Sequence, residues 1–301
     1  DLDSTYAVAV ADFDFVNARV QATSAATFLV VGGVELNQLK ATTTYAQKRM
    51  EFEATVQQQA RELGVTGNAI FHPDHQELHL PALSLRADGI EWRNVPGSEA
   101  AIQYRQNEVS IKDLRLANGD QTLDVEGTLV LDAANADRTP VVGGANASLD
   151  VRARNIDLAQ AEKLALQNRG LSGRLTADAT ITGNLSAPTV DGTFQIADGG
   201  VQAYRFQSLV ADVDYRSHRI TLDATLQQSP GIAITARGTV PRTVFTSARS
   251  GHVAETPEDT IDVRVQTPAL NLGVIQGFTT AVTQVGGTVE PDVRITGSGR
   301  D

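Results

Sequence analysis

The amino-acid sequence predicts an all-β fold. We expect an elongated, curled, antiparallel-rich sheet of repeated hairpins that forms an open hydrophobic trough, a β-taco-like shape, with one or two short helical inserts. A hairpin pattern that recurs along the 301 residues predicts this fold, together with a period-2 alternation of apolar and polar side chains. Turn-forming residues separate the alternating segments at short intervals and indicate about twenty strands.

The recurring hairpin pattern is an aromatic residue, then four or five polar turn residues, then an alternating strand. Copies start at Tyr45, Phe71, Tyr104 and Tyr215. A second repeat, GRLTADATITGN from residue 173, returns as GTVEPDVRITGS from residue 287. Such internal similarity is typical of arrays in which each unit stacks on its neighbours. We therefore expect a single elongated β-repeat array over residues 1–301, with approximate units 1–96, 97–200 and 201–301.

Period-2 alternation divides the residues of each expected strand between two faces. In residues 175–182 the odd positions are Leu, Ala, Ala and Ile, whereas the even positions are Thr and Asp. Residues 50–57 and 220–226 alternate in a similar way. This pattern is typical of antiparallel sheets that have one apolar face and one solvated face.

Turn and helix signals complete the assignment of elements. Turn residues stand, among other places, at positions 118–120 (Asn-Gly-Asp), 198–200 (Asp-Gly-Gly) and 229–231 (Ser-Pro-Gly). Residues 157–168 predict a short helix with Asp157 as its N-cap, and residues 271–282 predict a weaker one. Residues 242–259 predict a loop.

Composition excludes several classes of function. A net charge of −11 and a pI near 4.9 argue against nucleic-acid binding, because no basic surface is available to neutralise phosphates. Without cysteine the chain has no disulfide, thiolate metal site or thiol nucleophile. No apolar run is long enough to span a bilayer. We expect the chain to be a fragment, so missing targeting signals say little about the parent protein.

A long array of alternating strands has to shield its apolar face from water. About twenty strands stacked at roughly 4.8 Å give a sheet on the order of 95 Å long, and strand twist makes such a sheet curl. Curled with its apolar face inward, the sheet becomes a trough, and each acyl CH2 contributes roughly 0.8 kcal/mol on leaving water for its lining. The expected lining residues are Leu175, Ile181, Phe194, Ile196, Leu209, Val213, Ile220, Leu222, Leu226, Ile232 and Ile234.

Two segments resemble a known family. They are YRQNEVSIKDLRLANGDQTLDVEGTLVL from residue 104 and IDLAQAEKLALQNRGLSGRLTADATITGNLSAPTVDGTFQIADGGVQ from residue 156. The shared pattern is a Leu-rich stretch, L-S-G-x-L with an alternating strand, and then T-G-x-L-x-x-P-x-x-x-G with a strand ending in D-G-G. On these motifs most of residues 45–301 resembles the AsmA-like, TamB-type family of envelope proteins.

The resemblance implies a periplasmic body, β-rich and trough-shaped, of an inner-membrane-anchored protein from a Gram-negative-type bacterium. It implies phospholipid as the cargo moved between the inner and outer membranes, and a role in outer-membrane biogenesis. It also implies a partner outer-membrane barrel protein of the translocation and assembly module. We expect the membrane anchor and the partner-binding end to lie outside this fragment.

One cluster of ionisable residues stands out as a candidate metal site. It comprises His72, Asp74, His75, Glu77 and His79, whose imidazole and carboxylate groups suit Zn or Ni. The other copies of the hairpin place polar turn residues at the same positions. We therefore expect a solvated hairpin tip with no metal, and no cofactor elsewhere.

No residue set predicts catalysis. Acidic residues two positions apart lie together on the solvated face of a strand, where general acid–base catalysis is not expected. The serines lack a Gly-x-Ser-x-Gly context or a nearby base. We therefore expect no catalytic residues and no enzyme. The residues considered are Asp12 with Asp14, Glu51 with Glu53, Asp212 with Asp214, and Ser172, Ser186 and Ser229.

Three functions remain open at this point. The first is a segment of a bridge-like protein that moves phospholipid between the two membranes through an apolar groove. The second is a scaffold for the assembly or secretion of outer-membrane barrel proteins, which acts through exposed strand edges without conducting lipid. The third is a β-solenoid adhesin, which is disfavoured because the short strict periods of that class are missing.

Overall fold

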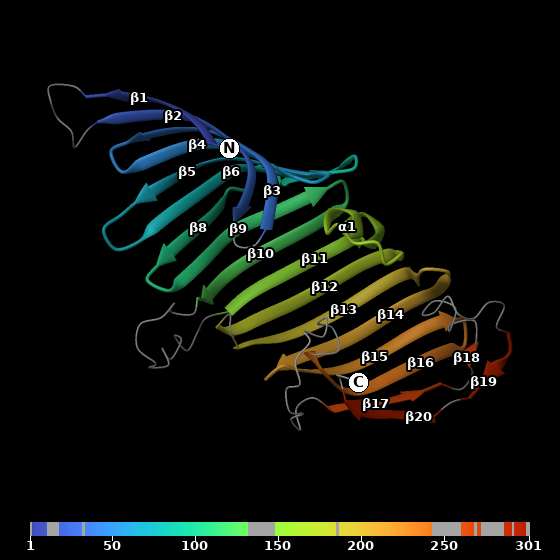
Figure 1. Ribbon diagram of the computed structural model, residues 1–301. Helices are drawn as coiled ribbons and strands as arrows, with labels where there is room; N and C mark the ends of the chain where they lie inside the picture. Colours follow the sequence, from blue (N-terminus) through green and yellow to red (C-terminus); the bar gives the residue numbers. More distant parts are fainter. Residues whose placement is uncertain are drawn as a thin grey trace. The chain divides into compact units, whose positions relative to one another are not determined.

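The structure is a computed structural model of the chain, and it describes residues 2–10, 18–31, 34–131, 148–184, 187–242, 260–267, 270–271, 286–290 and 292–298. The described part holds twenty strands and one helix. It divides into two compact units, Asp1–Val142 and Gly143–Asp301, each built around an antiparallel sheet (Figure 1). The prediction of an all-β fold of curled, antiparallel hairpins is confirmed. The three approximate repeat units stay a prediction, because compactness does not test sequence repeats.

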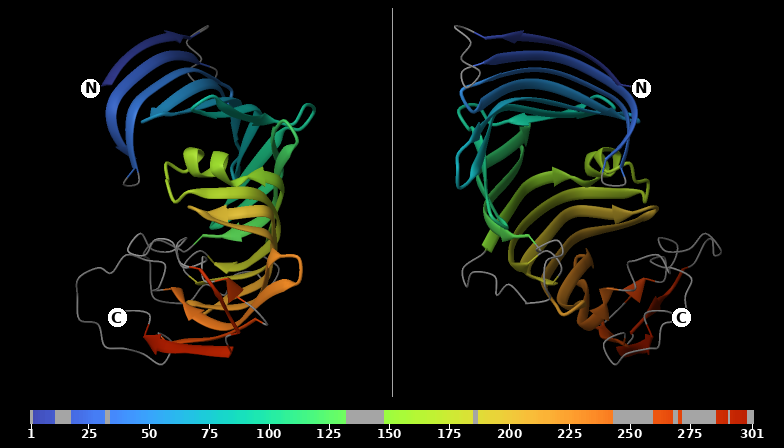
Figure 2. Two further views of the ribbon diagram at one scale, coloured as in Figure 1. Left: turned by 90° about the vertical axis from the view of Figure 1, so that its right-hand side faces the viewer. Right: turned by 60° about the vertical axis from the view of Figure 1, so that its left-hand side comes forward.

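The first unit contains ten strands. The first six, β1 to β6, pair in chain order and lie side by side as strongly bowed ribbons in Figure 2. Strands β7 and β8 then share one position in the sheet: both pair with β6 on one side and with β9 on the other, and β10 follows β9. The bounds are β1 (Leu2–Ala9), β2 (Arg19–Val31), β3 (Val34–Ala46), β4 (Arg49–Gln58), β5 (Arg61–Phe71), β6 (Gln76–Ala87), β7 (Ile90–Asn94), β8 (Ala100–Arg105), β9 (Glu108–Asn118) and β10 (Gln121–Val130).

The second unit pairs its strands in chain order from β11 to β17, and β20 pairs with β17. Strands β18 and β19 form a separate two-stranded sheet. The bounds are β11 (Ser148–Asp157), β12 (Leu171–Asn184), β13 (Ala187–Val201), β14 (Tyr204–Arg216), β15 (Arg219–Ser229), β16 (Ile232–Pro241), β17 (Thr260–Gln266), β18 (Leu270–Asn271), β19 (Thr288–Val289) and β20 (Asp292–Ser298).

The recurring hairpins lie where the sequence predicts them. Tyr45, Tyr104 and Tyr215 each stand next to last in a strand, and Phe71 is the last residue of β5. In the turns that follow β3 and β14, both central residues have positive φ angles, between 48° and 63°. Two such residues in a row form a primed turn, whose twist matches that of the flanking strands.

The predicted helix with an Asp157 N-cap is confirmed. Helix α1 (Leu158–Leu164) begins directly after Asp157, whose carboxylate accepts a hydrogen bond of 3.1 Å from the backbone N–H of Gln160. It is shorter than predicted, because Leu166 has a φ angle of 54°, which no α-helix contains. Most of the weaker predicted helix and of the predicted loop, residues 272–282 and 243–259, lies outside the described residues.

The predicted turn at residues 198–200 is wrong, whereas those at 118–120 and 229–231 are confirmed. Residues 198–200 lie inside β13, and the glycines serve close packing instead. A Cβ atom on Gly199 would lie 2.2 Å from the ring of Phe206, so a larger residue would displace that buried ring. Asp198 has a φ angle of 49°, and the alternation of burial along β14 changes phase opposite this point.

Buried apolar side chains gather in the first unit where β7 and β8 share one position. We call this group the sealed patch. Trp92 is 6% exposed and Ala100 is 0% exposed, and Leu80, Ala87 and Ile90 complete the group. Among the described residues, no helix has the length and apolar character needed to cross a membrane.

Candidate functional site

The strand register of the second unit places the predicted lining residues on one face of the sheet. Leu175, Ile196, Leu209, Leu226 and Ile234 are direct partners in turn across β12, β13, β14, β15 and β16. Directly opposite residues of antiparallel strands project from the same face. They therefore form one apolar row that crosses five strands, roughly 19 Å at the usual strand spacing.

Three further rows run parallel to this one and hold the other predicted residues. Ile181 begins a row that reaches Ile220, Phe194 lies in a row of alanines, and Val213 pairs with Leu222. Ile232, at the start of β16, shares the parity of Ile234. The rows are Ile181–Val190–Tyr215–Ile220–Val240, Ala177–Phe194–Ala211–Ala224–Ala236 and Gly192–Val213–Leu222–Gly238–Val263.

These four rows, together with Ile232, are the apolar face of the second unit. All eleven predicted lining residues are half-buried. They touch neighbours on the same face and keep part of their surface open. The residues next to them in the strands, such as Thr193, Asp212 and Asp223, are exposed on the opposite face. The face could accept an apolar ligand without first being unpacked.

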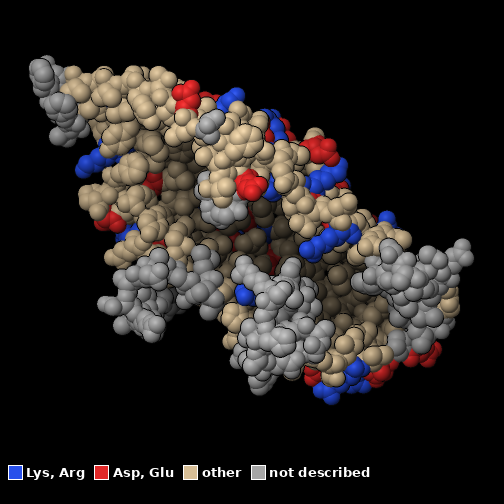
Figure 3. Space-filling model, in the orientation of Figure 1, with Lys and Arg blue, Asp and Glu red and all other residues tan. Residues whose placement is uncertain are grey.

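The first unit has an apolar face of the same kind, which the sequence analysis did not list. A row runs through the direct partners Leu2–Ala26–Leu39–Val56–Leu63–Leu85–Trp92. Its β1 end is open, since Leu2 is 72% exposed, and its β7 end lies in the sealed patch. Figure 3 shows a hollow over this unit that is lined largely by uncharged residues. The alternation at residues 50–57 was the signal that could have found it.

Aromatic side chains mark one edge of this first apolar face. Tyr45, Phe71 and Tyr104 lie at the ends of β3, β5 and β8, and all three are exposed. The ring centroids of Tyr45 and Phe71 are 6.2 Å apart. Sequence analysis treats these residues as turn-flanking groups, and their placement in a row follows only from the parallel direction of the three strands.

The paired acids lie on the polar face, as the alternation predicts. In the second unit a groove of about 630 Å³ runs along this face, with Asp212 and Asp214 in its lining. The guanidinium of Arg216 lies 2.7 Å from Asp214 Oδ2 and 3.0 Å from Asp191 Oδ1. A hydrogen bond shared with the carboxyl group of Asp214, and one donated by the guanidinium of Arg216, lower the pKa of Asp191. The lining of this groove is therefore charged and solvated, unlike the apolar face on the other side of the same strands.

Of the other candidates for catalysis, those that the structure describes lie apart from one another. Glu51 and Glu53 are exposed on β4. Ser172 and Ser229 lie in β12 and β15, far apart in the strand order. Asp12, Asp14 and Ser186 lie outside the described residues.

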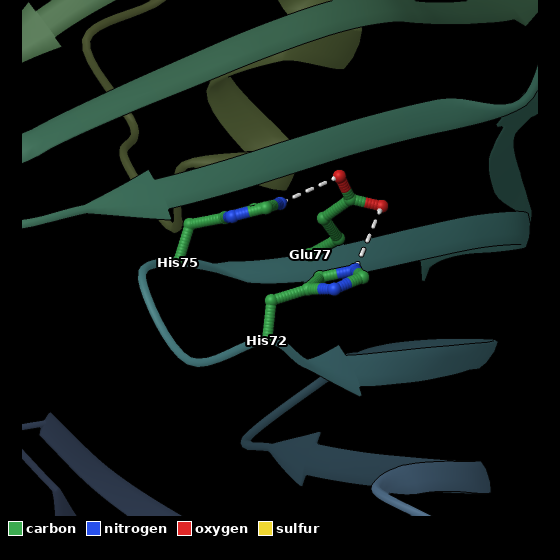
Figure 4. A group of neighbouring side chains, drawn as sticks. All are labelled: His72, His75 and Glu77. Atoms are coloured by element: carbon green, nitrogen blue, oxygen red, sulfur yellow. Dashed lines mark hydrogen bonds and ion pairs between the residues drawn. The ribbon is translucent and has the colours of Figure 1, made fainter.

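The β5–β6 hairpin brings the predicted histidine cluster together. His75 Nε2 lies 3.0 Å from Glu77 Oε1, and His72 Nε2 lies 4.0 Å from Glu77 Oε2, so the carboxylate lies between two imidazoles (Figure 4). On its other side His75 Nδ1 lies 2.9 Å from Asp74 Oδ1. The hydrogen bond with Asp74 raises the pKa of His75, and that with His79 lowers the pKa of Glu77.

Comparison with protein families identifies the chain. Residues 111–299, nearly two thirds of the sequence, match the family described as the TamB C-terminal domain. The chain belongs to the TamB family. The resemblance found in the sequence is thereby confirmed, and all eleven predicted lining residues fall inside the matched region. No curated protein and no solved structure gave a match.

Membership in the TamB family fixes the broad class of function. The family consists of envelope-associated proteins of the translocation and assembly module, and it is a transport and envelope family, not an enzyme family. This agrees with the absence of a predicted catalytic set. The TamB family match does not distinguish lipid transport from assistance to barrel assembly.

Proposed function

We propose that the apolar face of this chain holds the acyl chains of phospholipids, and that the chain is a segment of a periplasmic conduit between the inner and outer membranes. The supporting observation is the set of four apolar rows across β12 to β16, whose side chains remain half-buried. A sealed core would leave no surface for a ligand of this size.

The energetics favour a lipid tail over water on this face. An acyl chain gains roughly 0.8 kcal/mol for each CH2 that leaves water. Because each row repeats at every strand, a tail that moves along the sheet meets a similar lining about every 4.8 Å. A tail can therefore advance from one strand to the next without returning fully to solvent.

The TamB family match supports a setting in the cell envelope. In this proposal the chain lies in the periplasm as part of an inner-membrane-anchored protein. It works with an outer-membrane barrel of the translocation and assembly module, and it supports outer-membrane biogenesis. The TamB family assignment supports an envelope-associated protein of the translocation and assembly module, and the finer statements are part of the proposal.

Crosslinking on neighbouring residues tests the proposal. A photoreactive amino acid is placed in the 301-residue chain at Ile181 or Leu222, on the apolar face, and each variant is incubated with vesicles of radiolabelled phospholipid. The matched controls are the adjacent positions Thr180 and Asp223, which project from the polar face. We expect labelled lipid at the first pair only. Equal labelling of both faces, or no labelling at all, refutes the proposal that the apolar face binds lipid.

A scaffold for barrel assembly is the alternative. Such a scaffold would bind unfolded barrel strands through backbone hydrogen bonds at strand edges. Replacement Leu222→Asp separates the two functions, since it places a charge in the middle of an apolar row. If the unaltered chain captures lipid and the Leu222→Asp variant does not, the conduit is supported. If neither the unaltered chain nor the variant captures lipid, and both bind the unfolded barrel peptide equally well, the scaffold is supported.

A further inference from the structure

We propose that the tip of the β5–β6 hairpin binds a divalent transition-metal ion of the zinc type through His72, His75 and Glu77. The ligand atoms of these three residues lie within 4.8 Å of one another. The proposal is independent of the lipid face, because these side chains belong to the hairpin tip and the polar side of β6.

The donor atoms are close to the spacing that zinc requires. Zinc binds histidine nitrogen and carboxylate oxygen at 2.0–2.2 Å, so donors in a tetrahedral site lie about 3.3 Å apart. His75 Nε2 and Glu77 Oε1 are 3.0 Å apart, and His72 Nε2 is 4.0 Å from Glu77 Oε2. Small movements of the side chains therefore complete the site, with water in the remaining position.

A second carboxylate prepares His75 as a ligand. Asp74 Oδ1 can only accept a hydrogen bond, so His75 Nδ1 carries the proton of the 2.9 Å contact between them. This leaves Nε2 free to bind a metal, and such carboxylate–histidine pairs are a common support of zinc ligands. Arg105, from β8, holds Asp74 in turn through a contact of 3.2 Å.

The Glu77 carboxylate lies against the ring nitrogen of His75 that faces away from Asp74. The 3.0 Å contact between His75 Nε2 and Glu77 Oε1 places a nitrogen ligand and an oxygen ligand side by side, as one bound ion requires. His79 Nε2 lies 3.3 Å from the other oxygen of Glu77 and holds the carboxylate in place.

The backbone of the hairpin positions the ligands. The backbone N–H of His72 donates a hydrogen bond of 2.9 Å to the carbonyl of His75, which closes the turn around Pro73. His75 and Glu77 are two positions apart and so project from one side of the chain. The two imidazole rings are stacked, with centroids 4.3 Å apart. The His72 side chain is 40% exposed and has room to turn its Nε2 toward the ion, while that of His75 is 14% exposed and held.

Sequence reasoning favours a solvated tip because the other hairpins show polar turns at the same positions. The hairpin between β14 and β15 illustrates the difference. Its tip residue His218 contacts the hydroxyl of Tyr215 at 3.4 Å and belongs to no such ligand group among the described residues. Of these two hairpin tips, only the β5–β6 tip surrounds its imidazoles with carboxylates. This difference could not be predicted from the sequence, because it depends on how Asp74 and Glu77 fold around His75.

Zinc titration of the 301-residue chain tests the proposal. The protein is prepared without a histidine tag, stripped with a chelator and titrated with Zn²⁺ by calorimetry. We expect one equivalent to bind, and His75→Ala or Glu77→Gln to abolish this binding. Asp74→Asn should weaken it by roughly 10–100-fold, since it removes the supporting carboxylate only. The matched control His218→Ala should bind zinc as the unaltered protein does.

Two further measurements keep the test independent of the stability of the variants. Circular dichroism of each variant without metal should match the unaltered chain. X-ray absorption of the zinc-loaded, unaltered chain should show two imidazole ligands with oxygen in the remaining positions. Absence of stoichiometric binding, binding that survives in the double variant of His75→Ala with Glu77→Gln, or a shell without imidazole overturns the proposal.

Discussion

The sealed patch at β6 to β8 and the open apolar face at β12 to β16 arise from the same kind of sequence. Both consist of apolar residues at alternate positions of antiparallel strands. In the first, Trp92 and Ala100 are buried almost completely, whereas in the second Leu222 and Ile234 are half-buried. Alternation therefore decides which face a side chain takes, but not whether that face is closed.

The difference lies in the backbone. In the sealed patch two short strands occupy one position of the sheet, and the irregular stretch of β6 beside them is held by Asn94. Its side chain accepts a hydrogen bond of 2.7 Å from the N–H of Leu83 and donates one of 3.1 Å to the carbonyl of Leu80. Strands β14 to β16 pair regularly over most of their length and have no such feature. In this chain irregular pairing accompanies the closed face, and mostly regular pairing accompanies the open one.

The largest expected effect is the replacement Trp92→Ala. Emptying a closed site removes buried surface and leaves a cavity, so we expect a loss of about 3–5 kcal/mol in the free energy of unfolding. Leu222→Ala, on the open face, should cost only roughly 1 kcal/mol, because part of its side chain already contacts water. Urea unfolding followed by far-ultraviolet circular dichroism measures both. Equal costs at the two sites contradict the distinction between closed and open faces.

A second comparison within the second unit should give an intermediate effect. Gly199→Ala places a methyl group against the buried ring of Phe206, and overpacking of this kind costs typically about 1–3 kcal/mol. Gly297→Ala in β20 is the matched control, since a Cβ there meets no atom within 4 Å. Urea midpoints compare the two variants. A loss of stability at Gly297 as large as at Gly199 rules out the steric explanation.

The smallest effect is expected on the polar face of β17 and β20. Asp262 pairs with Arg294 at 2.8 Å and Asp292 with Arg264 at 2.6 Å, and these hydrogen bonds lower the pKa of both carboxyl groups. A lowered pKa in the folded state stabilises the fold above the ordinary pKa, and the gain disappears as the pH falls through the lowered value.

Thermal unfolding between pH 7 and pH 2 measures this contribution. The double variant Asp262→Asn with Asp292→Asn should melt slightly below the unaltered chain at pH 7, and the gap should vanish at the acidic end. Salt should also reduce the gap at pH 7, because the pairs are exposed. A gap that widens toward low pH contradicts the assignment.

Much of the fold follows from local signals in the sequence. The aromatic positions Tyr45, Phe71, Tyr104 and Tyr215 locate hairpins, and Asp157 locates the start of the helix, because turns and caps depend on neighbouring residues. The turn expected at residues 198–200 failed for a long-range reason: Gly199 is required by the ring of Phe206, which reaches it from the next strand.

The candidate sites divide in the same way. Parity alone assigns Leu175 to Ile234 to one face, so the rows could be predicted from sequence. Their half-open state could not, since it depends on how the strands pair in the folded sheet. The histidine cluster shows the same limit, because a carboxylate from Glu77 and another from Asp74 meet one imidazole only after the hairpin has folded.

The tight turns after β3 and β14 constrain how such a chain can change. Side chains alternate with a period of two, so a one-residue slip of register, which a change in the length of a two-residue turn can cause, moves the charges of the next strand onto the apolar side. Insertions and deletions that keep the apolar side chains on one face are therefore those that leave the register unshifted, such as changes of two residues or changes absorbed by longer connections. A family built in this way can lengthen by whole hairpins far more readily than by single residues.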